Sequence, residues 1–259
     1  MLQPAGGVNS LAGMAVVEGA GVELAYEERG DGPPVVLVHG MAADREAWAD
    51  VAVALEGDAR VIAYDRRGYG GSGAPEPYDA TTVAEQGEDL AALLGAIGAR
   101  GAVAAGADLG ALVVLDVLLR HPGLLRAAVL VGPPLMQFVP EAMEPMAAER
   151  LALENALRDD GRSRAIELWL AARGIADPGR LERARRDAGA FFADYGGQAS
   201  LPVSRRELRA LAVPLVILDT PHAPGHVRAA ADALARLVPD ARRAGAEDVV
   251  AAIRGLLDT

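Results

Sequence analysis

The sequence contains no cysteine and no lysine, so all 25 of its basic residues are arginine. Without cysteine, the 259-residue chain can form no disulfide, no thiolate metal site and no cysteine nucleophile. For the same reason, cysteine usage does not indicate whether the protein resides in an oxidising or a reducing compartment. We interpret the missing lysine, together with the abundance of Ala, Gly and Val, as a coding bias. The formal net charge of −11 argues against a nucleic-acid partner, because no basic face is available to displace counterions.

Signals for export, membranes and cofactors are also missing. The first fifteen residues contain no basic residue, and no apolar run approaches membrane-spanning length. The four histidines do not cluster with carboxylates at metal-ligand spacing, and no phosphate loop or dinucleotide fingerprint is present. We therefore expect a cytoplasmic protein with no membrane partner, no metal and no cofactor. The oligomeric state is not indicated.

Two alternating patterns fill the rest of the chain. Short β-branched runs bounded by Gly or Pro predict buried strands, namely Gly21–Glu28, Pro34–Val38, Arg60–Tyr64, Ala102–Ala105, Ala127–Val131 and Pro214–Asp219. Apolar residues at helical spacing predict helices over Thr82–Ile97, Leu109–Arg120, Val227–Leu237 and Glu247–Leu257. The continuous apolar character of the strands indicates burial on both faces. The predicted class is α/β, with a mostly parallel sheet covered by helices.

One region interrupts this alternation. Between residues 133 and 212 there are helical patterns over Glu144–Leu157, Arg162–Ala172 and Gly179–Asp194, and no convincing strand. A helical insertion between two sheet strands is best placed as a cap over the carboxyl edge, where open α/β sheets bind ligands. The expected organisation is a Gly-rich flexible leader (1–18), a core domain (19–132 and 213–259) and a helical cap (133–212).

The segment Gly106-Ala-Asp-Leu-Gly110 connects a predicted strand to a predicted helix. Its two glycines permit a tight turn and a close approach of strand and helix, which pushes Asp108 out at the helix N-terminus. The alternative is that Asp108 merely caps the helix, since Asp is a favoured N-cap. The motifs on either side of this turn favour the functional interpretation.

Those motifs resemble the α/β-hydrolase superfamily. Four stretches match in the correct order, namely Val35–Met41 (VVLVHGM), Asp65–Gly73 (DRRGYGGSG), His121–Pro122, and the strand end Val131–Pro133. The resemblance runs from about residue 21 to residue 259, and Asp108 stands at the nucleophile elbow, where most members carry serine. It implies an oxyanion hole formed by the backbone N–H groups of Met41 and Leu109. It also implies structural roles for His39, in the turn, and for His121, at a helix end.

The other two triad positions depart from the family pattern. The family's acid follows the strand that matches Pro214–Asp219, and Ala223 stands at that position. Its base is a histidine in a loop after one further strand, just before the last helix. Here the chain passes almost directly from helix to helix between Val238 and Asp248. We therefore expect the last strand and its histidine loop to be truncated, so that the usual relay cannot form.

Three uses of Asp108 follow. The favoured hypothesis is an enzyme in which Asp108 is a general acid or base for a non-hydrolytic cyclisation, elimination, addition or rearrangement of a small apolar, natural-product-like molecule. The second is an epoxide- or ester-type hydrolase with Asp108 as nucleophile and a relocated base, His222 or His226. Against epoxide hydrolases, Trp does not follow Asp108, Met41-Ala42 replaces the x-Pro of their H-G-x-P motif, and Tyr195 is the only cap tyrosine. The third is a non-catalytic binding homologue.

The remaining candidates concern the walls of the site. We expect seven side chains to contact the substrate, although aromatic and Met residues in a cap more often pack in the core. They are His39, Met136, Phe138, Trp169, Phe191, Tyr195 and His226.

Overall fold

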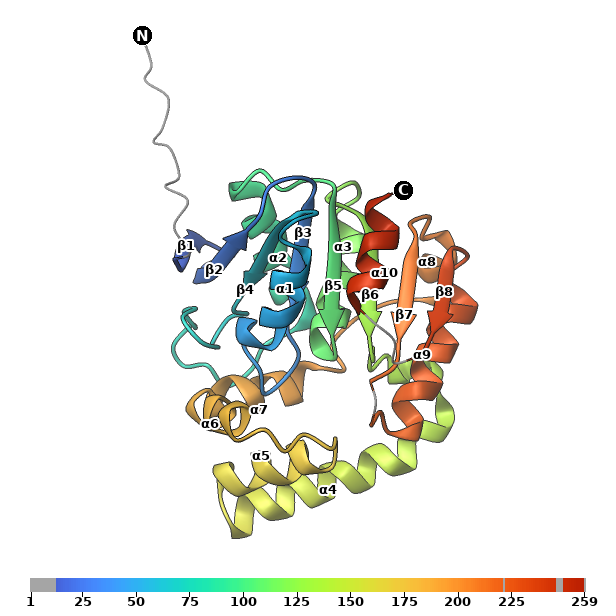
Figure 1. The fold of residues 1–259 in the computed structure, drawn as a ribbon. Helices are drawn as coiled ribbons and strands as arrows, with labels where there is room; N and C mark the ends of the chain where they lie inside the picture. Colours follow the sequence, from blue (N-terminus) through green and yellow to red (C-terminus); the bar gives the residue numbers. More distant parts are fainter. Residues whose placement is uncertain (1–12, 221, 246–248, 259) are drawn as a thin grey trace.

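The computed structural model describes residues 13–220, 222–245 and 249–258 and contains one eight-stranded sheet (Figure 1). Its strands are β1 (Ala15–Glu18), β2 (Glu23–Arg29), β3 (Pro34–Val38), β4 (Arg60–Tyr64), β5 (Ala102–Ala107), β6 (Leu125–Val131), β7 (Leu215–Leu218) and β8 (Ala241–Ala244). They lie in the order β1-β2-β4-β3-β5-β6-β7-β8. The pairs β1/β2 and β2/β4 are antiparallel and the other five are parallel. The predicted mostly parallel sheet is confirmed.

Burial on both faces explains why the central strands are apolar throughout. Successive side chains of a strand point to opposite faces. Val36 and Val38 of β3 therefore join one hydrophobic cluster, and Val35 and Leu37 join the other. Each cluster requires a layer of helices to exclude water from it.

Two helix layers provide this cover. The first cluster receives side chains from α2 (Val83–Ala96), α3 (Leu109–Arg120) and α9 (Gly225–Leu237). The second receives side chains from α1 (Ala49–Leu55), which follows the 3₁₀ turn η1 (Arg45–Trp48), and from α10 (Val249–Leu257). In Figure 1, α1 and α10 lie in front of the sheet and α2 and α3 behind it. Within the described residues, no helix combines the length and apolarity needed to span a bilayer.

Two strands correct the sequence-based expectations. Residues 15–18 of the predicted leader form β1, whose alternating burial reflects packing on one face only; residues 1–12 lie outside the described part. The last strand is also present, because β8 pairs in parallel with β7. It was missed because Ala241-Arg-Arg-Ala244 has no β-branched residue and lies at the sheet edge, where an apolar pattern is not required.

The elements between β6 and β7 are all helical. They are η2 (Met136–Phe138), η3 (Pro140–Ala142), α4 (Met143–Asp159), α5 (Arg162–Ala171), α6 (Pro178–Arg186), α7 (Ala188–Gly197) and α8 (Arg205–Ala210). Figure 1 shows α4 and α5 beyond the arrowheads of β5 and β6, at the carboxyl edge of the sheet. The single helix predicted over Gly179–Asp194 is wrong. It is broken at Asp187, whose carboxylate accepts a hydrogen bond from Gly70 N–H and is paired with Arg186.

Candidate active site

The turn from β5 to α3 holds Asp108 in a backbone conformation that side chains rarely adopt, with φ 50° and ψ −122°. Neighbouring backbone enforces this turn. A Cβ on Gly106 would lie 2.4 Å from the Gly110 carbonyl oxygen, and one on Gly110 would lie 2.4 Å from the Val38 carbonyl oxygen. The glycines predicted for close approach are therefore required. Strain of this kind is characteristic of nucleophile elbows and other functional turns.

Gly110→Ala is expected to destabilise the protein by about 3 kcal/mol or more, because its Cβ would overlap backbone atoms that cannot move independently of β3. The matched control is Gly95→Ala, also in a helix, where the added Cβ meets open space. That change should raise stability by about 0.5–1 kcal/mol through helix propensity. Urea denaturation of both variants measures the difference. Equal free energies of unfolding would contradict the close approach.

The Asp108 side chain does not cap α3 in the usual way, because it makes no hydrogen bond to the N–H of Gly110 or Ala111. Its Oδ2 instead accepts a hydrogen bond from the Met41 N–H at 3.1 Å. The Leu109 N–H is a second backbone donor that stabilises the carboxylate. Both N–H groups predicted to form the oxyanion hole therefore contact Asp108 itself. Gly40 allows this approach, since a Cβ there would lie 2.9 Å from the Asp108 Cβ.

The environment of Asp108 shifts the pKa of its carboxyl upward. Burial raises the pKa of Asp108 above its ordinary 3.8, while Arg173 and the N–H groups of Met41 and Leu109 lower it. Burial is the largest of these effects. The carboxyl is deep in the molecule and still partly accessible, because it lines an open cavity.

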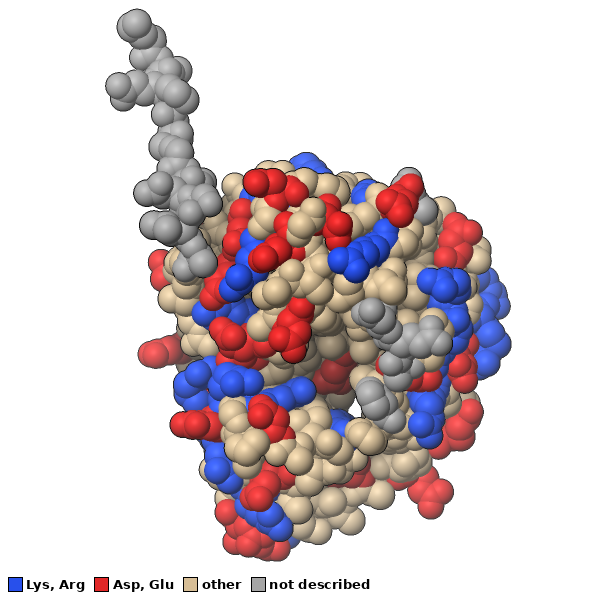
Figure 2. Space-filling view, in the orientation of Figure 1, with Lys and Arg blue, Asp and Glu red and all other residues tan. Residues whose placement is uncertain are grey.

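This cavity has a volume of about 390 Å³ and lies between the cap and the carboxyl edge of the sheet. Figure 2 shows a hollow between the cap and the core on the face of the molecule in view. Of the predicted contact residues, His39, Met136, Trp169, Tyr195 and His226 line it, and so does His222.

The structure corrects the other two predicted wall residues. Phe191 is fully buried and packs edge-on against Trp169 and Phe192, away from the cavity. Phe138 lies under the guanidinium of Arg205 and packs against the core. Both follow the more common outcome for aromatic residues in a cap, which is packing between helices.

His39 lines the cavity, and its ring is held by two hydrogen bonds. Its Nδ1 donates to the Gly40 carbonyl at 2.8 Å, and its Nε2 accepts from the Arg66 N–H at 2.9 Å. Both ring nitrogens are therefore occupied. Burial, reinforced by Arg66, holds the pKa of His39 well below its usual 6.5, so the ring is neutral. His121 lies at the end of α3, with its Nε2 3.3 Å from Glu88.

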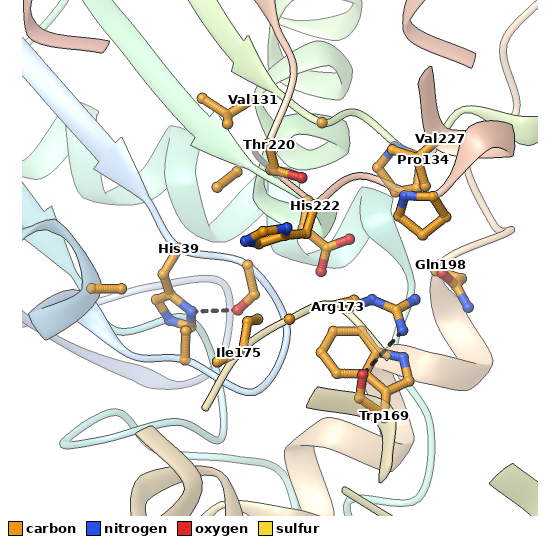
Figure 3. Close-up of a pocket in the computed structure, with 18 of the residues that line it drawn as sticks. His39, Val131, Pro134, Trp169, Arg173, Ile175, Gln198, Thr220, His222 and Val227 are labelled. Carbon is orange, nitrogen blue, oxygen red and sulfur yellow. Dashed lines mark hydrogen bonds between the residues drawn. The ribbon is translucent and has the colours of Figure 1, made fainter. Parts of the chain in front are cut away.

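His222 and His226 differ in their surroundings. His222 is exposed at the cavity rim, packs close to Gly174 of the cap, and makes no hydrogen bond with the described residues. The Nε2 of His226 lies 3.9 Å from Glu149, and burial lowers the pKa of His226. Figure 3 shows His222, His39 and Arg173 around the same space. No imidazole within the described residues donates a hydrogen bond to Asp108.

The two departures from the family triad have different structural outcomes. Ala223 at the acid position is buried, and β8 is followed by Gly245 rather than by histidine. Residues 246–248 lie outside the described part, and none of them is histidine. Asp219, at the end of β7, forms an ion pair with Arg243 of β8 at 2.6 Å. The strand that precedes the base is therefore present without the base.

Three charged cavity residues were missed from the sequence. They are Glu149 on α4, Arg173 just after α5, and Arg180 in the first turn of α6. Arg173 forms an ion pair with Glu149 at 2.6 Å and stacks on Trp169, with its guanidinium carbon 3.7 Å from the ring centroid (Figure 3). No local signal separates Arg173 and Arg180 from the other cap arginines, which is why they were not identified.

A buried charge network joins the cap to the turn that carries the predicted oxyanion donor. Arg66 donates to the carbonyls of His39 and Gly40 and pairs with Asp194 of α7 at 2.8 Å. Asp194 also accepts from Tyr69 and Gln86, each at 2.7 Å. The sequence offered one signal for this network, an acidic residue in the apolar stretch Ala190–Tyr195.

Comparisons with known proteins agree with this architecture. The sequence model of the alpha/beta hydrolase fold family matches residues 33–183, which are more than half of the chain. Epoxide hydrolase A of Mycobacterium tuberculosis is 35% identical over 133 residues, which are 50% of this chain and 40% of that protein. The 2-(acetamidomethylene)succinate hydrolase of Mesorhizobium japonicum is 28% identical over 203 residues, which are 74% of this chain and 69% of that protein.

Among solved structures, a thermophilic esterase from Thermogutta terrifontis superimposes with a TM-score of 0.74 at 25% identity, covering 95% of this chain and 98% of that one. The esterase RhEst1 from Rhodococcus gives a TM-score of 0.70 at 26% identity with the same coverage. The chain spans about half the length of relatives such as epoxide hydrolase A and the Bacillus subtilis hydrolase YraK. From the match over residues 33–183 and the shared architecture, the chain belongs to the alpha/beta hydrolase fold family.

Proposed function

We propose that this chain is a hydrolase in which Asp108 attacks an electrophilic sp3 carbon, such as an epoxide carbon, of a small and largely apolar molecule. The observation that carries this is the position of the Asp108 carboxylate. It is held by the Met41 and Leu109 N–H groups, and no side chain of the described residues donates a hydrogen bond to it. The carboxylate lines the cavity, so it is oriented and available for attack.

The proposed reaction has two steps. An Asp108 oxygen forms a bond to the carbon, the C–O bond of the epoxide ring breaks, and its electron pair passes to the ring oxygen. Water then attacks the Cγ of the aspartyl ester, and the Met41 and Leu109 N–H groups lie beside the oxygen that becomes negative. The bond between Cγ and the substrate-bound oxygen then breaks, which releases the product and restores the Asp108 carboxylate. Through a base, the two protons of this water reach the former ring oxygen and the oxygen released from Cγ, so that the product is a diol. The epoxide hydrolases of Mycobacterium tuberculosis and rat among the relatives support this substrate class.

We assign the base to His222. Its ring lines the cavity and has no hydrogen-bond partner within the described residues, whereas His226 lies beside Glu149. His39 is unsuitable, because both its nitrogens are occupied. A base is required at this point, since the ester intermediate otherwise persists.

A second candidate is the non-hydrolytic use of Asp108 as a general acid or base. It is favoured by two observations, namely that no imidazole of the described part is bonded to Asp108 and that burial raises the pKa of this carboxyl. Such chemistry needs no water-activating base. An Asp108 that is protonated in the resting enzyme could donate a proton to an apolar substrate.

Labelled water separates the two functions. With styrene oxide as probe, turnover in H₂¹⁸O is expected to place ¹⁸O in the Asp108 carboxyl, since water attacks Cγ and leaves one oxygen there. Mass spectrometry of the Asp108 peptide measures the label. In His222→Ala, the peptide should instead gain the mass of one substrate molecule as the ester accumulates, while Arg158→Gln, an exposed change, should behave like the parent.

Turnover without label, and without an adduct in His222→Ala, would overturn the nucleophilic role and favour acid–base chemistry. An adduct in His226→Ala, with none in His222→Ala, would support Asp108 as the nucleophile and would assign the base to His226 instead of His222. Failure to open any of a panel of aryl and alkyl epoxides would overturn the substrate class.

A further inference from the structure

Two arginines of the cap, Arg173 and Arg180, line the same cavity as the carboxyl at the elbow. Among the charged groups, Arg173 has the largest effect on the pKa of Asp108, which it lowers. Asp108 in turn has the largest effect of any charged group on the pKa of Arg180, which it raises. Most of the remaining wall is apolar, with Ala43, Val131 and Ile175 among its residues. Positive charge in such a wall is costly unless an anion compensates it. The negative charge that lies near each arginine therefore indicates whether the cavity also binds an anionic ligand.

Arg180 is poorly compensated. Its Nε and Nη2 donate to the carbonyls of Ala42 and Met41 at 3.1 and 3.3 Å, which are neutral acceptors. Within the described residues, no carboxylate lies within ion-pair distance of it, and its Nη1 makes no hydrogen bond. Burial lowers the pKa of Arg180 despite the opposing charge of Asp108. Of the five N–H donors of a guanidinium, those of Nη1 remain for a ligand.

Arg173, in the wall of the same cavity, is held by its neighbours. Its guanidinium stacks on Trp169 and is paired with Glu149, and its side chain is 20% exposed. Its orientation is further set by a hydrogen bond from Nη1 to the Trp169 carbonyl at 3.3 Å. Its Nε makes no hydrogen bond with the described residues. A guanidinium restrained in this way loses little conformational freedom when it binds an anion.

We propose that this cavity selects small molecules that carry a carboxylate on an apolar body, with the carboxylate bound by Arg180 and Arg173. The inference rests on the proposed function in taking this cavity as the substrate site. Asp108 is held on the core side by backbone N–H groups, while the arginines lie on the cap side. A bound acid would therefore place its apolar part between them. A volume of about 390 Å³ suits a molecule of arylalkanoic acid size.

Tryptophan fluorescence can measure this binding without turnover. The chain has two tryptophans, Trp48 and Trp169, and both line the cavity. Phenylacetate is expected to bind at least about 10-fold more tightly than its neutral isostere phenylacetamide, because charge-assisted hydrogen bonds to guanidinium are stronger than neutral ones. In Arg180→Gln, the affinity for phenylacetate should fall by about 10-fold while that for phenylacetamide is unchanged.

The matched control is Arg185→Gln, on the same helix, because Arg185 is exposed and lies beside Glu167 rather than in the cavity wall. Arg180→Lys keeps the charge and should retain part of the preference, which separates charge from any loosening of the Met41–Ala42 turn. Equal affinities for the two probes, equal effects of Arg180→Gln and Arg185→Gln, or no binding of either probe would each overturn the proposal. None of these results would bear on the ¹⁸O experiment, so the two proposals fail separately.

Discussion

Asp108→Asn is expected to lower kcat on the order of 10⁴-fold or more, because the amide is a far weaker nucleophile and cannot exchange a proton as a carboxyl does. The Met41 and Leu109 N–H groups can still donate to the amide oxygen, so the fold and the cavity should be retained. Asp240→Asn, an exposed change, is the control. Steady-state kinetics with an epoxide that the parent hydrolyses measures the ratio of the two kcat values. A loss below about 10-fold would remove Asp108 from the chemistry.

The same variant should be more stable than the parent at neutral pH. The folded-state pKa of Asp108 is raised above 3.8, so the folded protein bears a cost for ionising this carboxyl. That cost is absent below about pH 3.8, where the carboxyl is neutral in both states, and is complete once the pH exceeds the folded-state pKa. The stability gain of Asp108→Asn should therefore appear as the pH rises through that interval, as measured by thermal unfolding.

A nucleophilic Asp108 also predicts that kcat/KM of the parent rises over the same pH interval, because the ionised carboxylate is the reactive form. If Asp108 were instead a general acid, kcat/KM would fall over this interval.

Asp194→Ala is expected to destabilise the protein by about 3–5 kcal/mol, because it leaves the buried guanidinium of Arg66 without its counter-ion. A loss of this size is a large fraction of the stability of an ordinary domain. Urea denaturation measures it, and Asp159→Ala, at the exposed end of α4, is the control.

Asp194→Asn sharpens this experiment, since the amide oxygen keeps an acceptor for Tyr69 while the charge is lost. A loss intermediate between the parent and Asp194→Ala is expected. Turnover should also fall in both variants, because Arg66 donates to the carbonyls of His39 and Gly40, next to the Met41 N–H that holds Asp108. Full stability in Asp194→Ala would show that the network is not needed to hold the cap.

Local patterns identified those parts of the molecule that local interactions determine. Three elements, β3, β4 and α3, have the predicted bounds, because each is a mainly apolar segment between clear Gly, Pro or polar residues. The elbow was found for the same reason, since its glycines and Asp108 are adjacent in sequence. β8 and β1 escaped because they are short edge strands, and their partial burial leaves no continuous apolar run.

The charged part of the site could not be predicted in this way. Arg173, Arg180 and Glu149 come together only through the fold of the cap, and their roles depend on which side of a helix faces the core. The expected apolar substrate followed from this omission. Likewise, the sequence placed Met41 and Leu109 at the oxyanion hole, whereas the contact between their N–H groups and the Asp108 carboxyl depends on the side-chain rotation.

The bend at residue 108 is made entirely by main-chain neighbours and by glycines at 40, 106 and 110. The carboxyl at 108 adds a hydrogen bond from the Met41 N–H, which an amide oxygen can also accept. A hydroxyl, a thiol or an amide could therefore replace the carboxyl without any rearrangement of the scaffold. For this fold, the reactive group can therefore change by substitution of the single residue at the tip of the bend. The other changes that a new reaction needs concern the side chains around that residue and not the backbone of the bend.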